Sequence, residues 1–216
     1  MTTYLQSLKS AWVAGSTPNR RIINLAMTIF LVTWLMLSFA TYLRFIESRP
    51  GALIDDPILE LFTPIDLTWP IFIVTYPSLI IGLLLLLNKP DKFIIAFQAY
   101  GLMMLMRMVM MYTIPLEPPE DTIPLVDPFV ENAGKTGFVP TKDLFFSGHT
   151  GRMFMVFINM VNPIAKVTFF LVTCFIATAV ILQKVHYTID VAVAPFIAYC
   201  CLVFARTVRA KLQSWY

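Results

Sequence analysis

Six long apolar stretches constrain this chain more than any other feature. Each is close to the ~20 residues that an α-helix needs to cross the hydrocarbon core of a bilayer, which is about 30 Å thick. The predicted spans cover residues 22–42, 67–87, 93–113, 144–160, 167–183 and 189–205. The sequence therefore predicts an all-α integral membrane protein, a six-helix bundle formed by one domain over residues 1–216.

Composition supports the membrane assignment. Hydrophobic residues make up 58% of the 216 residues and charged residues only 13%, which is more apolar surface than one soluble core of this length could bury. The first apolar stretch is too long for the core of a cleaved signal peptide, so we expect it to anchor the chain. The net charge of +3 hides a polarised chain, because nearly all acidic residues lie in two longer loops, about 43–66 and 114–143, and it does not indicate nucleic-acid binding.

Basic residues set the expected orientation, because Lys and Arg beside short loops tend to remain in the cytoplasm. With both termini cytosolic, nine basic residues lie on the inner side and five lie on the outer side. The inner set is Lys9, Arg20, Arg21, Lys89, Lys92, Lys166, Arg206, Arg209 and Lys211, and the outer set is Arg44, Arg49, Lys135, Lys142 and Lys184. Two longer loops, about 43–66 and 114–143, then face the periplasm in a bacterium or the lumen or exterior in a eukaryote.

Only two histidines occur in the chain, and this orientation places both on the outer face. His149 begins the fourth predicted span and His186 precedes the sixth. Three further charged residues near or within spans, Arg107, Arg152 and Asp190, fall in the same layer. Charged groups at such depth cost several kcal/mol unless they are paired or face a wet cavity, so we expect a shared polar pocket.

These side chains match the needs of phosphoryl transfer. His186 would attack phosphorus through one ring nitrogen, while Asp190 four residues later holds the other nitrogen and fixes the tautomer. His149 would protonate the departing alcohol and later activate the acceptor. A phosphohistidine intermediate results, and neither a metal nor a cofactor is required.

Several residues are candidate phosphate ligands. Arg107 and Arg152 would neutralise phosphate oxygens, and Ser147 and Gly148 would bring backbone N–H groups close to the ligand. Two alternatives stay open, because Arg107 could instead pair with a loop carboxylate and Arg152 could extend to the outer interface.

Three supporting residues adjoin the histidines. Asp143 precedes the fourth predicted span, where an acidic side chain would cap the helix. Thr150 and Tyr187 follow the two histidines directly in the sequence.

These residues carry a resemblance to a known family. Ser147-Gly-His-Thr150, preceded by Asp143, and His186-Tyr-Thr-Ile-Asp-Val191 resemble the third and fourth signature motifs of the sphingomyelin synthase branch of the type 2 phosphatidic acid phosphatase superfamily. Arg107 with Thr113-Ile-Pro-Leu-Glu-Pro-Pro119 resembles part of the second motif, and Pro64-Ile-Asp66 loosely resembles the first. The signature motifs lie within about residues 100–195.

The resemblance implies a six-helix fold with cytosolic termini and a metal-independent active site on the exoplasmic face. Its catalytic triad maps onto His149, His186 and Asp190, with His186 as the nucleophile. It also implies a transferase of phospholipid and sphingolipid metabolism. Its partners would be the bilayer, a glycerophospholipid donor and a lipid-alcohol acceptor such as ceramide or diacylglycerol.

Departures from the family pattern bear on the reaction. The phosphatases of the superfamily carry a K-x6-R-P motif and an arginine six residues before the nucleophile; here that position is Val180 and the motif is missing. Fewer phosphate ligands favour a phosphodiester substrate and therefore headgroup transfer. The Cys-Gly that precedes the motif aspartate in animal enzymes is Thr141-Lys142 here.

Two alternatives to headgroup transfer remain from the sequence. A lipid phosphatase or a phospholipase C-like hydrolase would use the same residues with water as the acceptor. A transporter, or an iron site built from two histidines and one carboxylate, forms the third class. The headgroup, the acceptor and the oligomeric state stay open.

The second outer loop is rich in proline and in acidic residues. We expect it to cover the polar pocket without forming a helix. Its carboxylates could attract a cationic headgroup such as choline or ethanolamine; they belong to Glu117, Glu120, Asp121 and Asp127.

Overall fold

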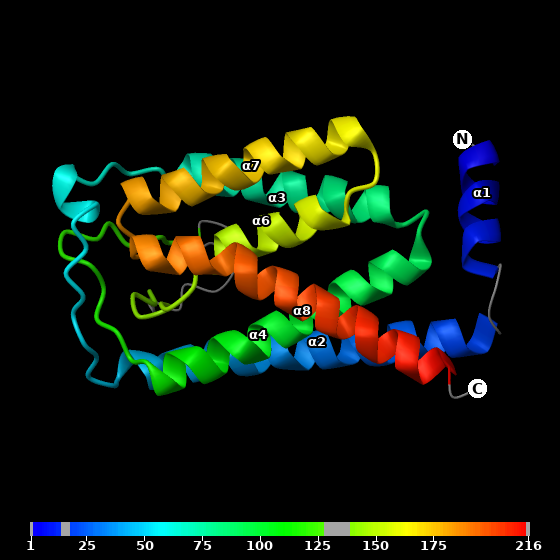
Figure 1. Ribbon diagram of the computed structural model, residues 1–216, viewed down its shortest axis with the longest axis horizontal. Helices are drawn as coiled ribbons and strands as arrows, with labels where there is room; N and C mark the ends of the chain where they lie inside the picture. Colours follow the sequence, from blue (N-terminus) through cyan, green and yellow to red (C-terminus); the bar gives the residue numbers. More distant parts are fainter. Residues whose placement is uncertain (1, 14–17, 128–138, 215–216) are drawn as a thin grey trace.

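The computed structural model describes residues 2–13, 18–127 and 139–214, and α-helices dominate all three segments. They contain seven α-helices, a short 3-10 helix and one isolated β-bridge between Ala52 and Leu116 (Figure 1). The elements in chain order are α1 (Thr2–Val13), α2 (Pro18–Glu47), η1 (Leu59–Leu61), α3 (Thr68–Leu86), α4 (Pro90–Thr113), α6 (Gly148–Asn159), α7 (Pro163–Leu182) and α8 (Thr188–Ser214).

Five of the described helices are long and apolar enough to cross a membrane, namely α2, α3, α4, α7 and α8. They coincide with five of the six predicted spans, and many of their large apolar side chains face outward, as expected for helices surrounded by lipid. The starts follow ordinary capping rules. Pro90 opens α4, and the Asn162 side chain accepts the backbone N–H groups of Ile164 and Ala165 at the start of α7.

The remaining span, the fourth in the chain and predicted over residues 144–160, is not confirmed. Helix α6 has only 12 residues, or about 18 Å at 1.5 Å per residue, which is too short to cross the hydrocarbon core alone. Leu144 and Phe146 gave this stretch its apolar character, but both are buried in a non-helical turn before the helix. Phe145 between them has a φ of 86°, which an α-helix cannot accommodate.

Although short, α6 occupies the centre of the bundle, where it contacts α3, α4, α7 and α8 (Figure 1). Its Met155 packs into one core cluster with Met103 of α4 and Ala198 of α8. Gly82 of α3 allows close approach, because a Cβ at that position would lie 2.6 Å from the Val156 side chain. The surrounding helices therefore hold α6, and the histidine at its start, in a fixed position.

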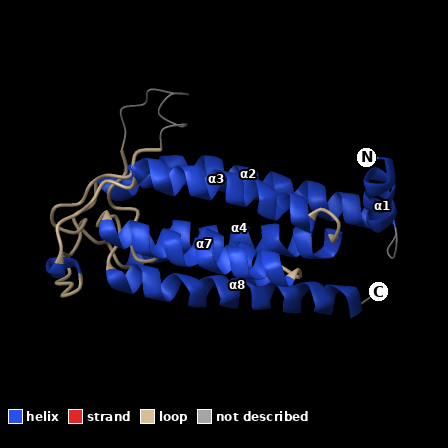
Figure 2. Ribbon diagram, turned by 90° about the horizontal axis from the view of Figure 1, so that it is seen from above, coloured by secondary structure: helices blue, strands red, loops and turns tan. Residues whose placement is uncertain are grey.

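Helix α1 was not predicted from the sequence, and it lies at the same end of the bundle as the C-terminal end of α8 (Figures 1 and 2). The Trp12 indole N–H donates to the carbonyl oxygen of Leu87 at 2.9 Å, and the Arg21 guanidinium donates to the carbonyl oxygens of Ala11 and Trp12 at 3.2 and 3.0 Å. The described parts of the two long loops, residues 48–67, 114–127 and 139–147, gather at the opposite end, which we call the loop end.

Candidate active site

A cavity of about 180 Å³ at the loop end brings the two histidines together. We call it the histidine pocket. It is lined by Phe72, Thr122, Pro124, Leu125, Asp127, Pro140, Thr141, Asp143, His149, Arg152, Val185 and His186. Of the five ionisable residues expected to share one polar pocket, His149, Arg152 and His186 therefore line the same cavity, whereas Arg107 and Asp190 do not. The lining comes from α3, from α6, from the turn before α8 and from described residues of the second long loop.

His186 is held by Asp190 as the i, i+4 spacing predicts. The His186 Nδ1 lies 3.3 Å from Asp190 Oδ2, and the two side chains are 2% and 0% exposed. The same Oδ2 accepts the backbone N–H of Tyr187 at 3.3 Å. An ionised carboxylate only accepts hydrogen bonds, so Nδ1 carries the proton and Nε2 keeps its lone pair.

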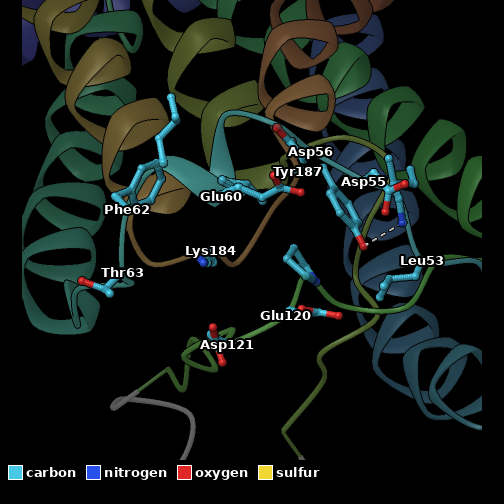
Figure 3. A pocket seen from close by; sticks show the side chains of 14 residues that line it. Leu53, Asp55, Asp56, Glu60, Phe62, Thr63, Glu120, Asp121, Lys184 and Tyr187 are labelled. Carbon is cyan, nitrogen blue, oxygen red and sulfur yellow. Dashed lines mark hydrogen bonds between the residues drawn. The ribbon is translucent and has the colours of Figure 1, made fainter.

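The first long loop, residues 48–67, fixes the turn that carries His186. Asp56 accepts the backbone N–H of Thr188 at 2.7 Å and its hydroxyl at 3.1 Å, so it caps α8 from a distant part of the chain. The Tyr187 hydroxyl donates to the carbonyl oxygen of Glu117 at 3.0 Å and accepts the backbone N–H of Ile54 at 3.3 Å (Figure 3). Both long loops thus bind the residue next to His186.

His149 is the second residue of α6, two positions after the cap residue Ser147. Ser147 caps the helix by accepting the backbone N–H of Thr150, and its own N–H donates to the carbonyl oxygen of Asp190 at 3.0 Å. This last bond ties the two signature motifs together. The His149 ring packs edge-on against Phe72, with centroids 6.0 Å apart, and its buried Nδ1 has no hydrogen-bond partner among the described residues.

Charge around His149 favours its neutral form. Burial lowers the pKa of His149 well below its usual value, and the positive charges of Arg152 and Arg107 act in the same direction. An anionic phosphate in the pocket would offset these charges and favour the protonated ring.

Arg107 and Asp143 form an ion pair beside the pocket. Arg107 Nη2 donates to Asp143 Oδ1 at 2.5 Å, and Arg107 is 6% exposed. Its guanidinium lies against Gly148 so closely that a Cβ there would overlap it. Of the two roles considered for Arg107, the structure therefore shows pairing with a loop carboxylate. Arg107 does not line the cavity. Arg152 does line it, and its Nε donates to the carbonyl oxygen of Gly148 at 3.2 Å.

Some predicted site residues have other positions. Asp143 was predicted to cap α6, but Ser147 caps this helix instead. The Asp143 carboxylate forms an ion pair with Arg107. Ser147 and Thr150 are buried and bond to each other. Tyr187 faces away from the histidine pocket.

The sequence analysis missed two residues that shape the pocket. Tyr76 on α3 donates a hydrogen bond from its hydroxyl to Asp127, which lines the pocket. Glu47, the last residue of α2, accepts the backbone N–H groups of Thr141 and Lys142 at 3.0 and 3.1 Å, which fixes the loop before Asp143. Loop contacts across such long sequence separations leave no periodic pattern, although the acidic character of the second loop was visible.

No three His, Cys, Asp or Glu side chains in the described ranges lie close enough together to hold a metal ion. Cys174, Cys200 and Cys201 are free thiols on α7 and α8.

Fold and site together define a multi-pass α-helical membrane protein with two histidines and an aspartate gathered at one end of the bundle. Residues 142–207 match the family model described as PAP2 superfamily C-terminal, and this range includes both histidines and Asp190. The match supports the PAP2 superfamily and hence an enzyme with activity of the lipid phosphatase or phosphotransferase type. No curated protein and no solved structure matches the chain.

Proposed function

We propose that this protein is a sphingomyelin synthase-like headgroup phosphotransferase. It moves a phospho-alcohol from a glycerophospholipid to a lipid alcohol such as ceramide or diacylglycerol. The observation that carries the proposal is that His186, paired with the buried Asp190, lines one cavity with His149 and Arg152. This set supplies a nucleophile, its tautomer-fixing partner, a second proton carrier and a cation.

In the first half-reaction, His186 Nε2 attacks the phosphorus of the donor phosphodiester. The bond from phosphorus to the glyceride oxygen breaks, and His149 gives its proton to that oxygen, so diacylglycerol leaves. Asp190 accepts the Nδ1 proton in a hydrogen bond and stabilises the positive charge that forms on the ring. Arg152 offsets the charge on the phosphate oxygens.

In the second half-reaction, the hydroxyl of the acceptor lipid attacks the phosphohistidine. His149, now neutral, takes the hydroxyl proton, the P–N bond breaks, and His186 regains its lone pair. Water in place of the lipid alcohol would give hydrolysis by the same steps. Val180, at the position of the phosphatase arginine, favours a phosphodiester substrate and therefore transfer.

A labelled-lipid assay tests the reaction. Purified protein receives a phospholipid labelled in both headgroup and acyl chains, with and without ceramide or diacylglycerol. Headgroup label should appear in a new lipid only when acceptor is present. Release of water-soluble phospho-headgroup in the absence of acceptor would instead identify a hydrolase. His186→Ala should abolish both products, and Asp91→Asn at the opposite end of the bundle should leave them unchanged.

We further propose that the loop end faces the exoplasmic side and that both termini are cytosolic, on the basis of the nine-to-five distribution of basic residues. Single cysteines at positions 9 and 120, introduced after Cys174, Cys200 and Cys201 are replaced, separate the two ends. A membrane-impermeant thiol reagent added outside intact cells should label position 120 alone. Labelling of position 9 alone would reverse the orientation.

A further inference from the structure

A second and larger cavity, of about 610 Å³, lies at the loop end. We call it the outer pocket. Its lining comes from the first outer loop, from Pro119–Asp121 of the second loop and from the turn before α8 (Figure 3). The residues are Leu53, Ile54, Asp55, Asp56, Leu59, Glu60, Leu61, Phe62, Thr63, Pro119, Glu120, Asp121, Lys184 and Tyr187.

One turn of chain separates the outer pocket from the histidine pocket. Within this turn, Val185 and His186 line the histidine pocket, whereas Lys184 and Tyr187 line the outer pocket. The second loop divides in the same way, since residues up to Asp121 line the outer pocket and residues from Thr122 line the histidine pocket. A ligand in the outer pocket would therefore lie next to the proposed nucleophile without touching it.

Lys184 is the residue that points to a ligand. It is only 8% exposed, and its side chain lines the outer pocket (Figure 3). Among the described residues its ammonium group makes no hydrogen bond and no ion pair, and Nζ lies 6.0 Å from the centroid of the Phe62 ring. The largely buried side chain thus brings an ammonium group to the pocket without a protein acceptor, and an anionic ligand group would supply that acceptor.

The carboxylates around this pocket favour a cationic ligand group. Asp55, Glu60, Glu120 and Asp121 line it, and none of these side chains forms a hydrogen bond or ion pair with another described residue. Asp56, by contrast, is engaged by Thr188. A purely anionic ligand would be repelled by the four carboxylates, and a purely cationic ligand would leave Lys184 unpaired. A ligand that carries both charges satisfies both sets.

We propose that the outer pocket binds a small zwitterion that combines a phosphate ester with a primary ammonium group. The phosphate contacts Lys184 Nζ, and the ammonium group donates hydrogen bonds to the carboxylates. Quaternary ammonium groups are recognised by aromatic cages, whereas the rings here are only those of Phe62 and Tyr187, which favours a primary amine. The choice of phosphate as the anionic group rests on the function proposed above.

Calorimetric titration of the purified full-length protein with O-phosphoethanolamine tests the site. Inorganic phosphate, ethanolamine and phosphocholine serve as partial ligands. We expect saturable binding of O-phosphoethanolamine at least tenfold tighter than binding of any of the three. Equal affinity for inorganic phosphate, equal affinity for ethanolamine, or no binding at all would overturn the proposal.

Variants locate the ligand. Lys184→Met should weaken binding at least tenfold, whereas Lys166→Met, at an exposed lysine of α7 near the opposite end, should leave it unchanged. The double variant Glu60→Gln/Glu120→Gln should weaken binding too, and it gives a second test if Lys184→Met fails to fold. Unaltered affinity in both pocket variants contradicts the proposal.

His186→Ala separates this inference from the proposed function. Binding should persist in this variant, because His186 lines the other cavity. Loss of binding in His186→Ala together with retention in Lys184→Met would place the ligand in the histidine pocket and overturn the inference. Absence of headgroup transfer with intact, Lys184-dependent binding would refute the proposed function alone.

A competition experiment identifies the source of the ligand. Dihexanoylphosphatidylethanolamine, which carries the same charged groups on a short-chain lipid, is added to protein saturated with O-phosphoethanolamine. Displacement shows that the headgroup of a lipid enters the pocket. Retention shows that the free phosphorylated amine is the ligand, and both results support the site.

Discussion

Both proposed catalytic histidines stand where a helix begins, but the two helix starts are held in different ways. The start of α6 is capped by its own sequence neighbour, Ser147. The start of α8 is capped by Asp56 from the first long loop, 132 residues away. The side chains differ as well, because His186 is fixed by Asp190 while Nδ1 of His149 has no partner in the described part of the chain.

The difference between these two helix starts fits the two proposed roles. A nucleophile gains from one fixed tautomer and orientation, since the lone pair must point at phosphorus throughout the reaction. A proton carrier must change its protonation state twice in each cycle, and a ring without a fixed partner at Nδ1 can do so more readily. Four substitutions test how far the comparison holds.

Asp190→Asn should have the largest effect. Without the carboxylate, His186 loses the acceptor that fixes its tautomer, and headgroup transfer should fall by about 10³–10⁴-fold in the labelled-lipid assay. Asp91→Asn, the same change at the opposite end of the bundle, is the matched control and should retain activity. A loss below tenfold for Asp190→Asn would show that the carboxylate does not support the nucleophile.

Gly148→Ala should have the second-largest effect on activity. The new Cβ would overlap the Arg107 guanidinium, so the ion pair with Asp143 must shift or break. We expect a loss of about 1–3 kcal/mol of stability and about 10²-fold in activity, measured by thermal unfolding and by the lipid assay. Gly101→Ala is the control, because its Cβ would meet only side-chain atoms of Val32 and Leu35, at 3.3 and 3.7 Å.

Asp56→Ala and Ser147→Ala compare the two caps directly. Each substitution should cost about 0.5–2 kcal/mol in thermal unfolding, because each removes one helix cap. Asp56→Ala should also lower activity about tenfold, since it releases the turn that carries His186 and this turn must hold its position. Asn162→Ala, which removes the cap of α7, should reduce stability without this loss of activity. Equal activities in Asp56→Ala and Asn162→Ala would show that the cap at the start of α8 has no special role in positioning His186.

The smallest expected effect is a pH dependence in the loops that hold Tyr187. A hydrogen bond from Lys142 and another from the backbone N–H of Gly51 lower the pKa of Glu117. A carboxylate with a lowered pKa stabilises the fold above its ordinary pKa of about 4.3, and this contribution is lost as the pH falls through the lower value. The melting temperature of the wild type should therefore approach that of Glu117→Gln as the pH drops below about 4.

The Lys142→Met variant checks the cause. With the ammonium group gone, Glu117→Gln should change the melting temperature less than it does in the wild type, at neutral pH. An unchanged difference would assign the stabilisation to the Gly51 N–H alone.

Five helices could be predicted because each is a long apolar run with clear ends. Pro90 and Asn162 mark two of the starts, and lipid outside the bundle requires apolar side chains almost everywhere. Helix α6 could not be predicted correctly, since buried apolar residues in a turn and in a helix give the same hydropathy. Leu144 and Phe146 illustrate this ambiguity, which only the φ of Phe145 resolves.

The candidate site likewise contains one pair that could be predicted from the sequence and one that could not. The i, i+4 spacing of His186 and Asp190 places both side chains on one face of one turn, so the sequence predicted this pair from local geometry. Arg107 and Asp143 are separated by 36 residues, and only packing of α4 against α6 decided that they pair with each other.

By itself, the sequence determined the membrane class, most of the helices and the pair at His186, because these follow from apolar length and from local spacing. Only the tertiary structure decided that α6 is short and central, that Asp56 caps α8, and that Lys184 lies buried in a second cavity behind the nucleophile. Such contacts join residues that are far apart in the chain. Their existence depends on how whole helices and loops pack, and no local pattern of residue types encodes that packing.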